Sequence, residues 1–438
     1  MKDLKLPISR YVVAGVISLL ACSAVAKENI PTTISLQYAL QRADSNHPDI
    51  EQAQAAIDLA KTEQLDAEAL TGTNVSIQSR LRYIEPNSGS TVQSHDDNSI
   101  GLFVTKNIYD FGRSDAASRA ANSAIRSERI SLASVRNQRR LDIMRRYFDV
   151  ILADLAYLRD NEDMATAFIR FDKASDRRDL GQLSDVEVLE LESAYQAVRL
   201  RRYRSDTRQR SMRSLLAVAM NQVGNLPATL EDPILLSLSR ELPKLENIQA
   251  LAKKDNPALL AAKARLDAAQ ARLASARASD GPVLSGEFEV SENSRAVGSR
   301  DDARIGLQLN IPLFTGGKTK ARIARQQAIV RSERANLAKQ QALVEQSVLD
   351  VWLELKNLGA QRQQANAQLD YSELYLDQRR ALYELETRTN LGDAMVRISE
   401  AQRFLKETEF SIAYHWAQLD ALMGKTVYAN EVEGEKQE

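Results

Sequence analysis

The sequence predicts a mainly α-helical fold with a small β part, in which long antiparallel coiled-coil hairpins are joined to four short strands. Three observations support this prediction. The chain has 438 residues but only 17 Gly and 10 Pro, with 27% charged residues, a composition typical of long solvated helices. A series of helix, strand, strand and two long helices occurs twice along the chain. Each strand alternates between one apolar and one polar face.

The composition also excludes several classes of function. The 58 basic and 59 acidic residues leave a net charge of -1, so no overall positive field would attract nucleic acid. The single cysteine is Cys22, and the 3 histidines, His47, His95 and His415, lie far apart in the sequence. Disulfides, cysteine-ligated zinc and histidine-rich metal sites are therefore not expected. We expect no cofactor, no nucleic-acid partner and no enzymatic activity, because the sequence contains no nucleophile elbow, metalloprotease helix or dinucleotide motif.

The first 26 residues have the pattern of a secretory leader. A basic start is followed by an apolar run over 11–21, and Ala24 and Ala26 offer small residues at the positions that a signal peptidase reads. We therefore expect 1–26 to be a signal peptide that is removed after Ala26. An alternative is lipidation of Cys22, which ends a loose lipoprotein motif that begins at Leu19.

An internal repeat divides the rest of the chain. The segment 108–114 recurs as 313–319, and Tyr147 in one helical run has Trp352 at the same offset in the other. This duplication predicts two copies of one structural unit. The expected parts are a first repeat, a proline-containing linker, a second repeat and an acidic C-terminal tail, at residues 34–221, 222–246, 247–424 and 425–438.

Each repeat is expected to begin with a helix, over about 35–70 and 247–279, and to end with a helical hairpin. From Arg113 to Leu180 there is neither Gly nor Pro, which allows a helix of about 100 Å at 1.5 Å per residue. Gly181 then breaks the run, and a second helical stretch follows. A long helix, a sharp turn and a long helix back predict an antiparallel coiled coil. The second repeat is expected to turn near Gly392.

The strands are the second part of each repeat. Four segments of about ten residues have one apolar and one strongly polar face, as outer-membrane strands do: 75–83, 100–109, 283–291 and 304–313. Lys106 is an exception on the apolar face, where a position near the membrane interface would let its amine reach water. The alternative is a soluble layered sheet with one solvated face. If the strands form a barrel, we expect these polar side chains to line its lumen: Arg80, Arg82, Glu287, Glu289, Gln308 and Asn310.

One chain with four such strands cannot close a barrel in lipid. Open strand edges are not tolerated there, and about eight strands are the minimum for closure. Several protomers must therefore contribute strands to one barrel. Charged helical hairpins cannot lie in lipid, so they are expected to project into water and to continue the barrel as a tube.

Several short segments resemble the TolC family of outer-membrane channel proteins, over about residues 34–424. They are the Asn/Pro segments at 46–48 and 256–257, the strand-to-helix junctions 109–113 and 312–318, and the hairpin-turn segments 181–189 and 387–389. The resemblance implies a homotrimer with a twelve-stranded barrel, four strands from each protomer, and a long periplasmic α-barrel. The Tyr-Asp-Phe-Gly form of the first junction is closer to the type I secretion branch than to the drug-efflux branch.

The resemblance also implies a gate at the periplasmic end, held by acidic, basic and tyrosine side chains near the hairpin turns. The residues at matching positions are Asp185, Glu187, Tyr383, Arg388 and Asp393. Aligning on 387–389 matches Tyr383 and Arg388 but puts Gly392 and Met395 where gate acids would lie. Aligning on Gly392 loses the arginine and leaves Asp393 as the nearest acid. Ordinary charge pairing at helix ends is the alternative explanation of these residues.

The function implied is a passive exit duct in the outer membrane of a Gram-negative bacterium, extending into the periplasm. It would serve type I protein secretion or multidrug efflux. The partners implied are a periplasmic adaptor (membrane fusion protein), an inner-membrane ABC or other pump, and outer-membrane lipid. The alternative is a soluble periplasmic coiled-coil adaptor without pore activity. The sequence leaves the cargo open between secreted proteins and small molecules.

Overall fold

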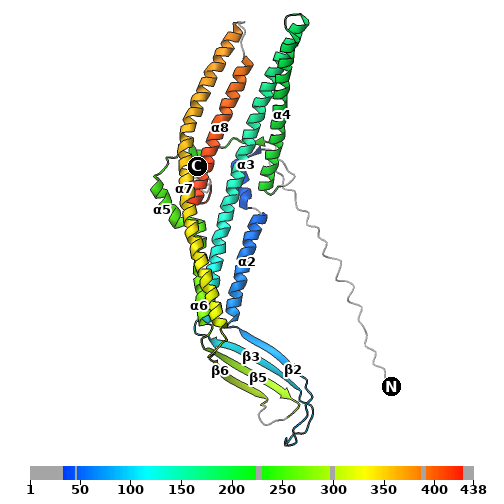
Figure 1. The fold of residues 1–438 in the computed structure, drawn as a ribbon, viewed down its shortest axis with the longest axis vertical. Coiled ribbons are helices and arrows are strands. Elements are labelled where there is room, and N and C mark those ends of the chain that lie inside the picture. Colours follow the sequence, from blue (N-terminus) through cyan, green and yellow to red (C-terminus); the bar gives the residue numbers. More distant parts are fainter. Residues whose placement is uncertain (1–32, 45–46, 223–228, 296–300, 386–390, 428–438) are drawn as a thin grey trace, which may run out of the picture.

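The fold is an elongated layer of helices with a small sheet at one end, and the pairs α3–α4 and α7–α8 extend to the other end (Figure 1). The computed structural model describes residues 33–44, 47–222, 229–295, 301–385 and 391–427. The expected signal peptide with Cys22 and most of the expected acidic tail lie outside the described residues. The prediction of a mainly α-helical fold with a small β part is confirmed.

The same order of elements occurs twice. The first set is α2 (Pro48–Ala69), β2 (Thr73–Arg80), β3 (Ser99–Tyr109), α3 (Arg113–Asp179) and α4 (Asp185–Ala219). The second set is α6 (Pro257–Ala278), β5 (Val283–Asn293), β6 (Ala303–Asn310), α7 (Lys318–Glu384) and α8 (Leu391–Leu422). In both sets a pair of strands is followed by a 67-residue helix and then by a shorter helix. No helix among the described residues is both long enough and apolar enough to cross a membrane.

The expected first helix of each repeat is broken in two, which corrects the prediction. The first is divided into α1 (Leu36–Gln41), a short 3-10 turn η1 (Arg42–Asp44) and α2, and the second into α5 (Leu245–Asp255) and α6. Both breaks precede a proline, which disfavours the helical conformation in the residue before it. Asn256 is extended there, and its side-chain oxygen caps α6 by accepting hydrogen bonds from the Ala258 and Leu259 amides. The last strand ends at Asn310, earlier than predicted, just before Pro312.

The four strands form one antiparallel sheet in the order β2-β3-β5-β6. Its register places apolar side chains opposite one another on a single face, for example Ile77 with Leu102 and Phe288 with Ile305. This face is not covered by any other part of the described chain. Ile77 is 73% exposed and Ile305 is 87% exposed, far more than large apolar side chains in a water-facing fold.

The main core lies at mid-height of the helices, where the segments before and between the repeats wrap around them. The Phe148 ring of α3 stacks on the Phe410 ring of α8, with centroids 4.3 Å apart. Around them are buried side chains from α1, α3, α4 and α8, including Leu40, Met144 and Leu216. A second core of α5, α7 and α8 contains Ile248, Val348 and Trp416.

Equivalent aromatic residues of the two repeats tie these wrapping segments to the long helices. The Tyr147 hydroxyl on α3 lies 2.9 Å from the Ile34 carbonyl oxygen and 2.6 Å from the Glu231 carbonyl oxygen. Ile34 is the last residue of β1 (Thr33–Ile34), and Glu231 directly follows β4 (Thr229–Leu230), which pairs with β1 in parallel. Trp352, at the equivalent place on α7, donates its indole N–H to the Pro243 carbonyl oxygen at 3.0 Å. Burial raises the pKa of Tyr147, so its hydroxyl remains a donor at any ordinary pH.

Candidate gate and lumen residues

The turn between α3 and α4 is shaped by Gly181, whose φ of 72° lies in the left-handed region. After it, Ser184 and Glu187 form a capping box at the start of α4. The Glu187 carboxylate accepts hydrogen bonds from the Ser184 amide at 2.9 Å and the Ser184 hydroxyl at 2.8 Å. These bonds lower the pKa of Glu187. Glu187 therefore caps its own helix, and Asp185 is exposed on the first turn beside it.

The remaining predicted gate residues belong to the other hairpin. Tyr383 lies one residue before the end of α7 and is 61% exposed. Arg388 lies outside the described residues. Asp393, on the first turn of α8, forms an ion pair with Arg170 of α3. Of the predicted set, Asp393 is thus the residue for which the structure gives a contact between the two hairpins.

Helix α8 lies very close to α3 at this point. Gly392 faces Thr166 so tightly that a Cβ atom added to Gly392 would collide with the Thr166 hydroxyl oxygen. The absence of a side chain therefore permits the close approach that brings Asp393 to Arg170. Farther along, the Ser399 hydroxyl of α8 donates to the Glu162 carboxylate of α3 at 2.6 Å.

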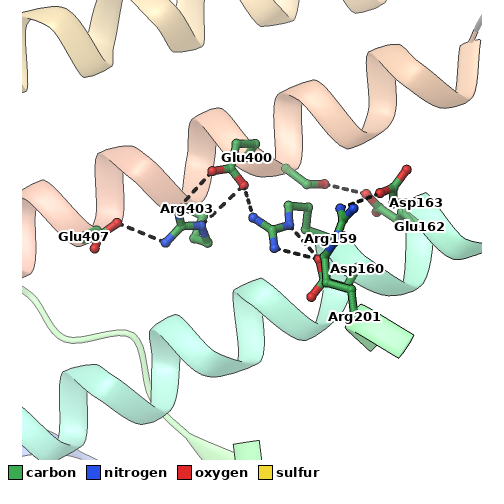
Figure 2. Close-up of polar contacts among 9 residues, drawn as sticks. Arg159, Asp160, Glu162, Asp163, Arg201, Glu400, Arg403 and Glu407 are labelled. Carbon is green, nitrogen blue, oxygen red and sulfur yellow. Dashed lines mark hydrogen bonds and ion pairs between the residues drawn. The ribbon is translucent and has the colours of Figure 1, made fainter. Parts of the chain in front are cut away.

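A chain of charged side chains continues this contact toward the core (Figure 2). The Arg159 guanidinium of α3 lies between the Glu400 carboxylate of α8, at 2.5 Å, and the Asp160 carboxylate, at 2.6 Å. Glu400 also pairs with Arg403 at 2.9 Å, and Arg403 pairs with Glu407 at 3.0 Å. From the other side of α3, Asp163 accepts from Arg201 of α4 at 2.9 Å. Ion pairs of α3 therefore link it separately to α4 and to α8.

The charges in this network stabilise one another. Burial acts to raise the pKa of Glu400, but hydrogen bonds from Arg403 and Arg159 outweigh it and lower that pKa. Burial likewise opposes the charge of Arg159, whereas its bonds to Glu400 and Asp160 raise its pKa. Hydrogen bonding to Glu400 also raises the pKa of Arg403. All three groups are therefore ionised at neutral pH.

Acidification is expected to loosen α8 from α3. The lowered pKa of Glu400 means that its contribution is complete above the ordinary value of 4.5 and is lost as the pH falls through the lowered value. We expect hydrogen exchange in α8, corrected for the intrinsic rate, to accelerate below about pH 4. The Glu400→Gln variant should exchange faster already at neutral pH and depend less on pH. The same pH dependence in wild type and variant would contradict this role of Glu400.

None of the α3 residues that contact Gly392, Asp393 and Glu400 was predicted. Arg159, Thr166 and Arg170 lie in the middle of a charged helix, more than 200 positions before their partners on α8 in the printed sequence. The spacing of Glu400, Arg403 and Glu407 by three and four residues was a visible sign of pairing within α8. The sequence carried no sign of which other helix they face.

The sheet register places most of the predicted lumen residues on one face. Arg80, Glu287, Glu289, Gln308 and Asn310 all alternate with the apolar side chains, and Arg304 pairs with Glu289 across β5 and β6. Arg82 differs, because it lies beyond the end of β2 and binds the buried Asp97 carboxylate in the β2–β3 connection. Lys106, on the apolar face, lies near the helix end of β3. Among the described residues, no group of three or more His, Cys, Asp or Glu side chains is placed to hold a metal ion.

Comparison with known proteins gives consistent matches. The sequence model of the family described as "Outer membrane efflux protein" matches residues 249–425. The chain is 28% identical to Protein CyaE of Bordetella pertussis over 264 residues, which cover 58% of this chain and 53% of that protein. It is 24% identical to Outer membrane efflux protein BepC of Brucella suis over 269 residues, which cover 59% of this chain and 56% of that protein. The matched segment thus spans about half the length of each relative.

The fold matches solved structures over nearly the whole chain. The outer membrane protein VceC of Vibrio cholerae superposes with a TM-score of 0.72 and 16% sequence identity. The match covers 90% of this chain and 96% of that chain. At this low identity the similarity establishes the arrangement of helices and strands, and it extends to the first repeat, which the family match does not include.

Proposed function

We propose that the chain is a member of the outer membrane efflux protein family, whose sequence model matches residues 249–425, and that it is one subunit of a passive exit duct in the outer membrane of a Gram-negative bacterium. The duct would extend into the periplasm and conduct cargo without catalysis of its own. Its partners would be a periplasmic adaptor and an inner-membrane ABC or other pump, which would supply the energy. Type I protein secretion and multidrug efflux are the two transport processes that this role fits.

The observation that carries this proposal is the uncovered apolar face of the sheet. Side chains such as Ile305 and Leu307 are 87% and 72% exposed, although removing each of these apolar side chains from water would lower the free energy. The opposite face carries Glu287, Glu289 and Gln308, which require water or polar partners. A sheet with these two faces suits a wall between lipid and an aqueous lumen. It speaks against the alternative of a soluble adaptor, for which such exposure would favour aggregation.

The sheet order supports assembly from three copies. Strands β2 and β6 are the two edges, and each has backbone groups that no strand of the described chain pairs. In lipid these groups must be satisfied, so the β6 edge of one copy would pair with the β2 edge of the next. Three copies would give twelve strands, enough to close a barrel, and the long helices would continue it as a periplasmic α-barrel.

We assign the gate of this duct to the contact between α8 and α3. Asp393 with Arg170, Gly392 against Thr166, and Glu400 with Arg159 would hold the second hairpin against the first near the turn end. Glu187 would contribute by shaping the α4 start, and Asp185, Tyr383 and Arg388 remain candidates at the constriction itself. Release of the α3–α8 contact would let the second hairpin swing outward and widen the opening.

The test is the mass and conductance of the mature protein extracted from outer membranes in detergent. We expect a trimer that gives discrete conductance steps in a planar lipid bilayer. The Ile305→Asn/Leu307→Asn variant makes the apolar face of the sheet more polar. After reconstitution, it should fail to insert into the bilayer. A soluble monomer that never inserts would overturn the proposal.

A further inference from the structure

A recess of about 720 Å³ lies beside the sheet, among the helices α2, α3, α6 and α7. Its floor is made of small side chains on α3: Ala117, Ala120 and Ala121. Because alanine does not extend above the helix, the longer side chains of the neighbouring helices surround this floor as walls. These walls are rich in arginine and lysine.

The recess lies on the concave side of the helical layer. The helices follow one another in the order α2, α3, α6, α7, since α2 packs on α3, α3 on α6 and α6 on α7. A recess lined by all four helices must lie on the side of the layer where the two outer helices, α2 and α7, approach each other. A second recess farther from the sheet also touches all four, with Ala60, Ala124, Ala269 and Ile329 in its lining. The Glu63 carboxylate of α2 even reaches the Arg272 guanidinium of α6, at 2.6 Å, across α3.

Positive charge is concentrated in the recess next to the sheet. Its lining contains five basic and two acidic side chains, a net charge of +3 per protomer. Glu63 is neutralised by Arg272, which leaves Asp66 as the acid facing a group of four bases: Arg113, Lys318, Arg322 and Arg325. In the second recess, Glu63, Glu128 and Glu333 outnumber Arg265 and Arg272. The excess of positive charge is therefore local to one level of the layer.

Helix ends do not explain or cancel this charge. Helices α3 and α7 begin at this level, with the positive ends of their dipoles, at Arg113 and Lys318. Helices α2 and α6 end at the same level, with the negative ends of theirs, at Ala69 and Ala278. The two kinds of partial charge offset each other, so the side chains determine the sign of the potential.

We propose that these four basic side chains of each protomer form a basic belt around the lumen, just below the barrel. This belt favours the passage of anions over that of cations. The inference rests on the proposed function, because only a closed assembly of three copies turns the concave face into a lumen. Three copies of the recess would bring a charge of about +9 to one level of the duct, and rings of charged side chains are a common basis of ion selectivity. The cargo class that suits such a belt carries net negative charge.

The experiment compares chloride and potassium permeability of the reconstituted trimer, from reversal potentials in a KCl gradient near 0.1 M. Wild type should prefer chloride. The Arg322→Glu/Arg325→Glu form should lower the ratio of chloride to potassium permeability by about threefold or more, because it changes the charge of the belt by four units per protomer. Arg331→Glu/Arg334→Glu is the matched control, since it makes the same change of charge on α7 outside both recesses.

Screening gives a second readout. The Debye length falls from about 10 Å at 0.1 M salt to about 3 Å at 1 M, so the difference between wild type and the recess variant should shrink at high salt. All forms are also compared in the Arg170→Ala background, where a loosened gate contributes less to the measured selectivity. The neutral Arg322→Gln/Arg325→Gln form should give an intermediate ratio, and it provides the comparison if the charge-reversed form does not assemble.

Equal permeability ratios in the recess and control variants would overturn the basic belt while leaving the duct intact. A cation-selective wild type whose ratio the recess variant does not change would overturn it as well. Absence of conductance in every form would overturn the proposed function and the belt together. The two failures are therefore distinguishable in one set of recordings.

Discussion

Replacing Asp393 with arginine is expected to open the proposed duct at the end of the helix pairs that lies away from the sheet. The substitution puts two guanidinium groups where Asp393 and Arg170 now form an ion pair between α8 and α3. A partly exposed pair contributes about 0.5 kcal/mol, and repulsion of similar size replaces it, so the change is about 1 kcal/mol per protomer. If the three hairpins open together, the sum of about 3 kcal/mol shifts the ratio of open to closed ducts more than tenfold.

The measurement is single-channel conductance of the trimer in planar bilayers, together with antibiotic uptake by cells that express it. Arg170→Asp in the Asp393→Arg background restores an ion pair with the charges exchanged and should close the duct again. Asp172→Arg introduces the same charge change on an exposed position of α3 and serves as the control. A duct that stays as closed in Asp393→Arg as in wild type would show that this pair does not hold the gate. So would a double variant that leaks as much as the single one.

The helices and strands of this fold were predictable because each depends on neighbours in sequence. Absence of Gly and Pro allowed α3 its full length, and Gly181 supplied the left-handed residue that the hairpin turn needs. The alternation of apolar and polar residues fixed the face of each strand, and the structure has the same faces. The breaks before Pro48 and Pro257 could also have been predicted, since proline disfavours a helical conformation in the residue that precedes it.

Each strand-to-helix junction contains a backbone turn that the duplicated sequence predicts only in part. Two consecutive residues have positive φ at each junction, Phe111 and Gly112 in the first repeat and Gly316 and Gly317 in the second. A non-glycine residue in this conformation costs free energy, which the surrounding contacts must offset. At the first junction, Asp110 caps the start of α3 by accepting from the Ser114 amide at 2.8 Å and hydroxyl at 3.0 Å. The repeated motif is thus a specific backbone turn.

The candidate gate was less predictable than the fold, because it depends on contacts between distant segments. The resemblance directed attention to Asp393, but its partner Arg170 looks like any other arginine on a solvated helix. Glu187 could have been interpreted differently, since Ser184 followed three residues later by glutamate is the sequence pattern of a capping box. Local hydrogen bonding is sufficient to explain that residue, whereas the α3–α8 network appears only after the helices have packed.

The largest loss of stability is expected from Tyr147→Ala. The Tyr147 side chain is fully buried, and its hydroxyl reaches the carbonyls of both Ile34 and Glu231. Removing the ring leaves a cavity beside Phe148 and Met144 and costs about 3–5 kcal/mol. Tyr147→Phe keeps the ring but leaves buried carbonyl oxygens without the hydroxyl, at a cost of about 1–3 kcal/mol. We follow the thermal unfolding of the detergent-solubilised protein by circular dichroism. Unfolding should begin at the lowest temperature for Tyr147→Ala and at the next lowest for Tyr147→Phe.

Tyr371→Ala is the matched control, because the same ring is removed from a position on α7 that is 54% exposed. It should unfold close to wild type. The physical reason for the difference is the place of Tyr147, whose hydroxyl joins the segments before and between the repeats to α3. Loss of this joint should release these segments at mid-height, while the sheet, about half the length of a long helix away, keeps its ability to insert. Equal unfolding temperatures of Tyr147→Ala and Tyr371→Ala would show that the contact made by Tyr147 is not needed, and that contacts between the helices hold the two repeats together.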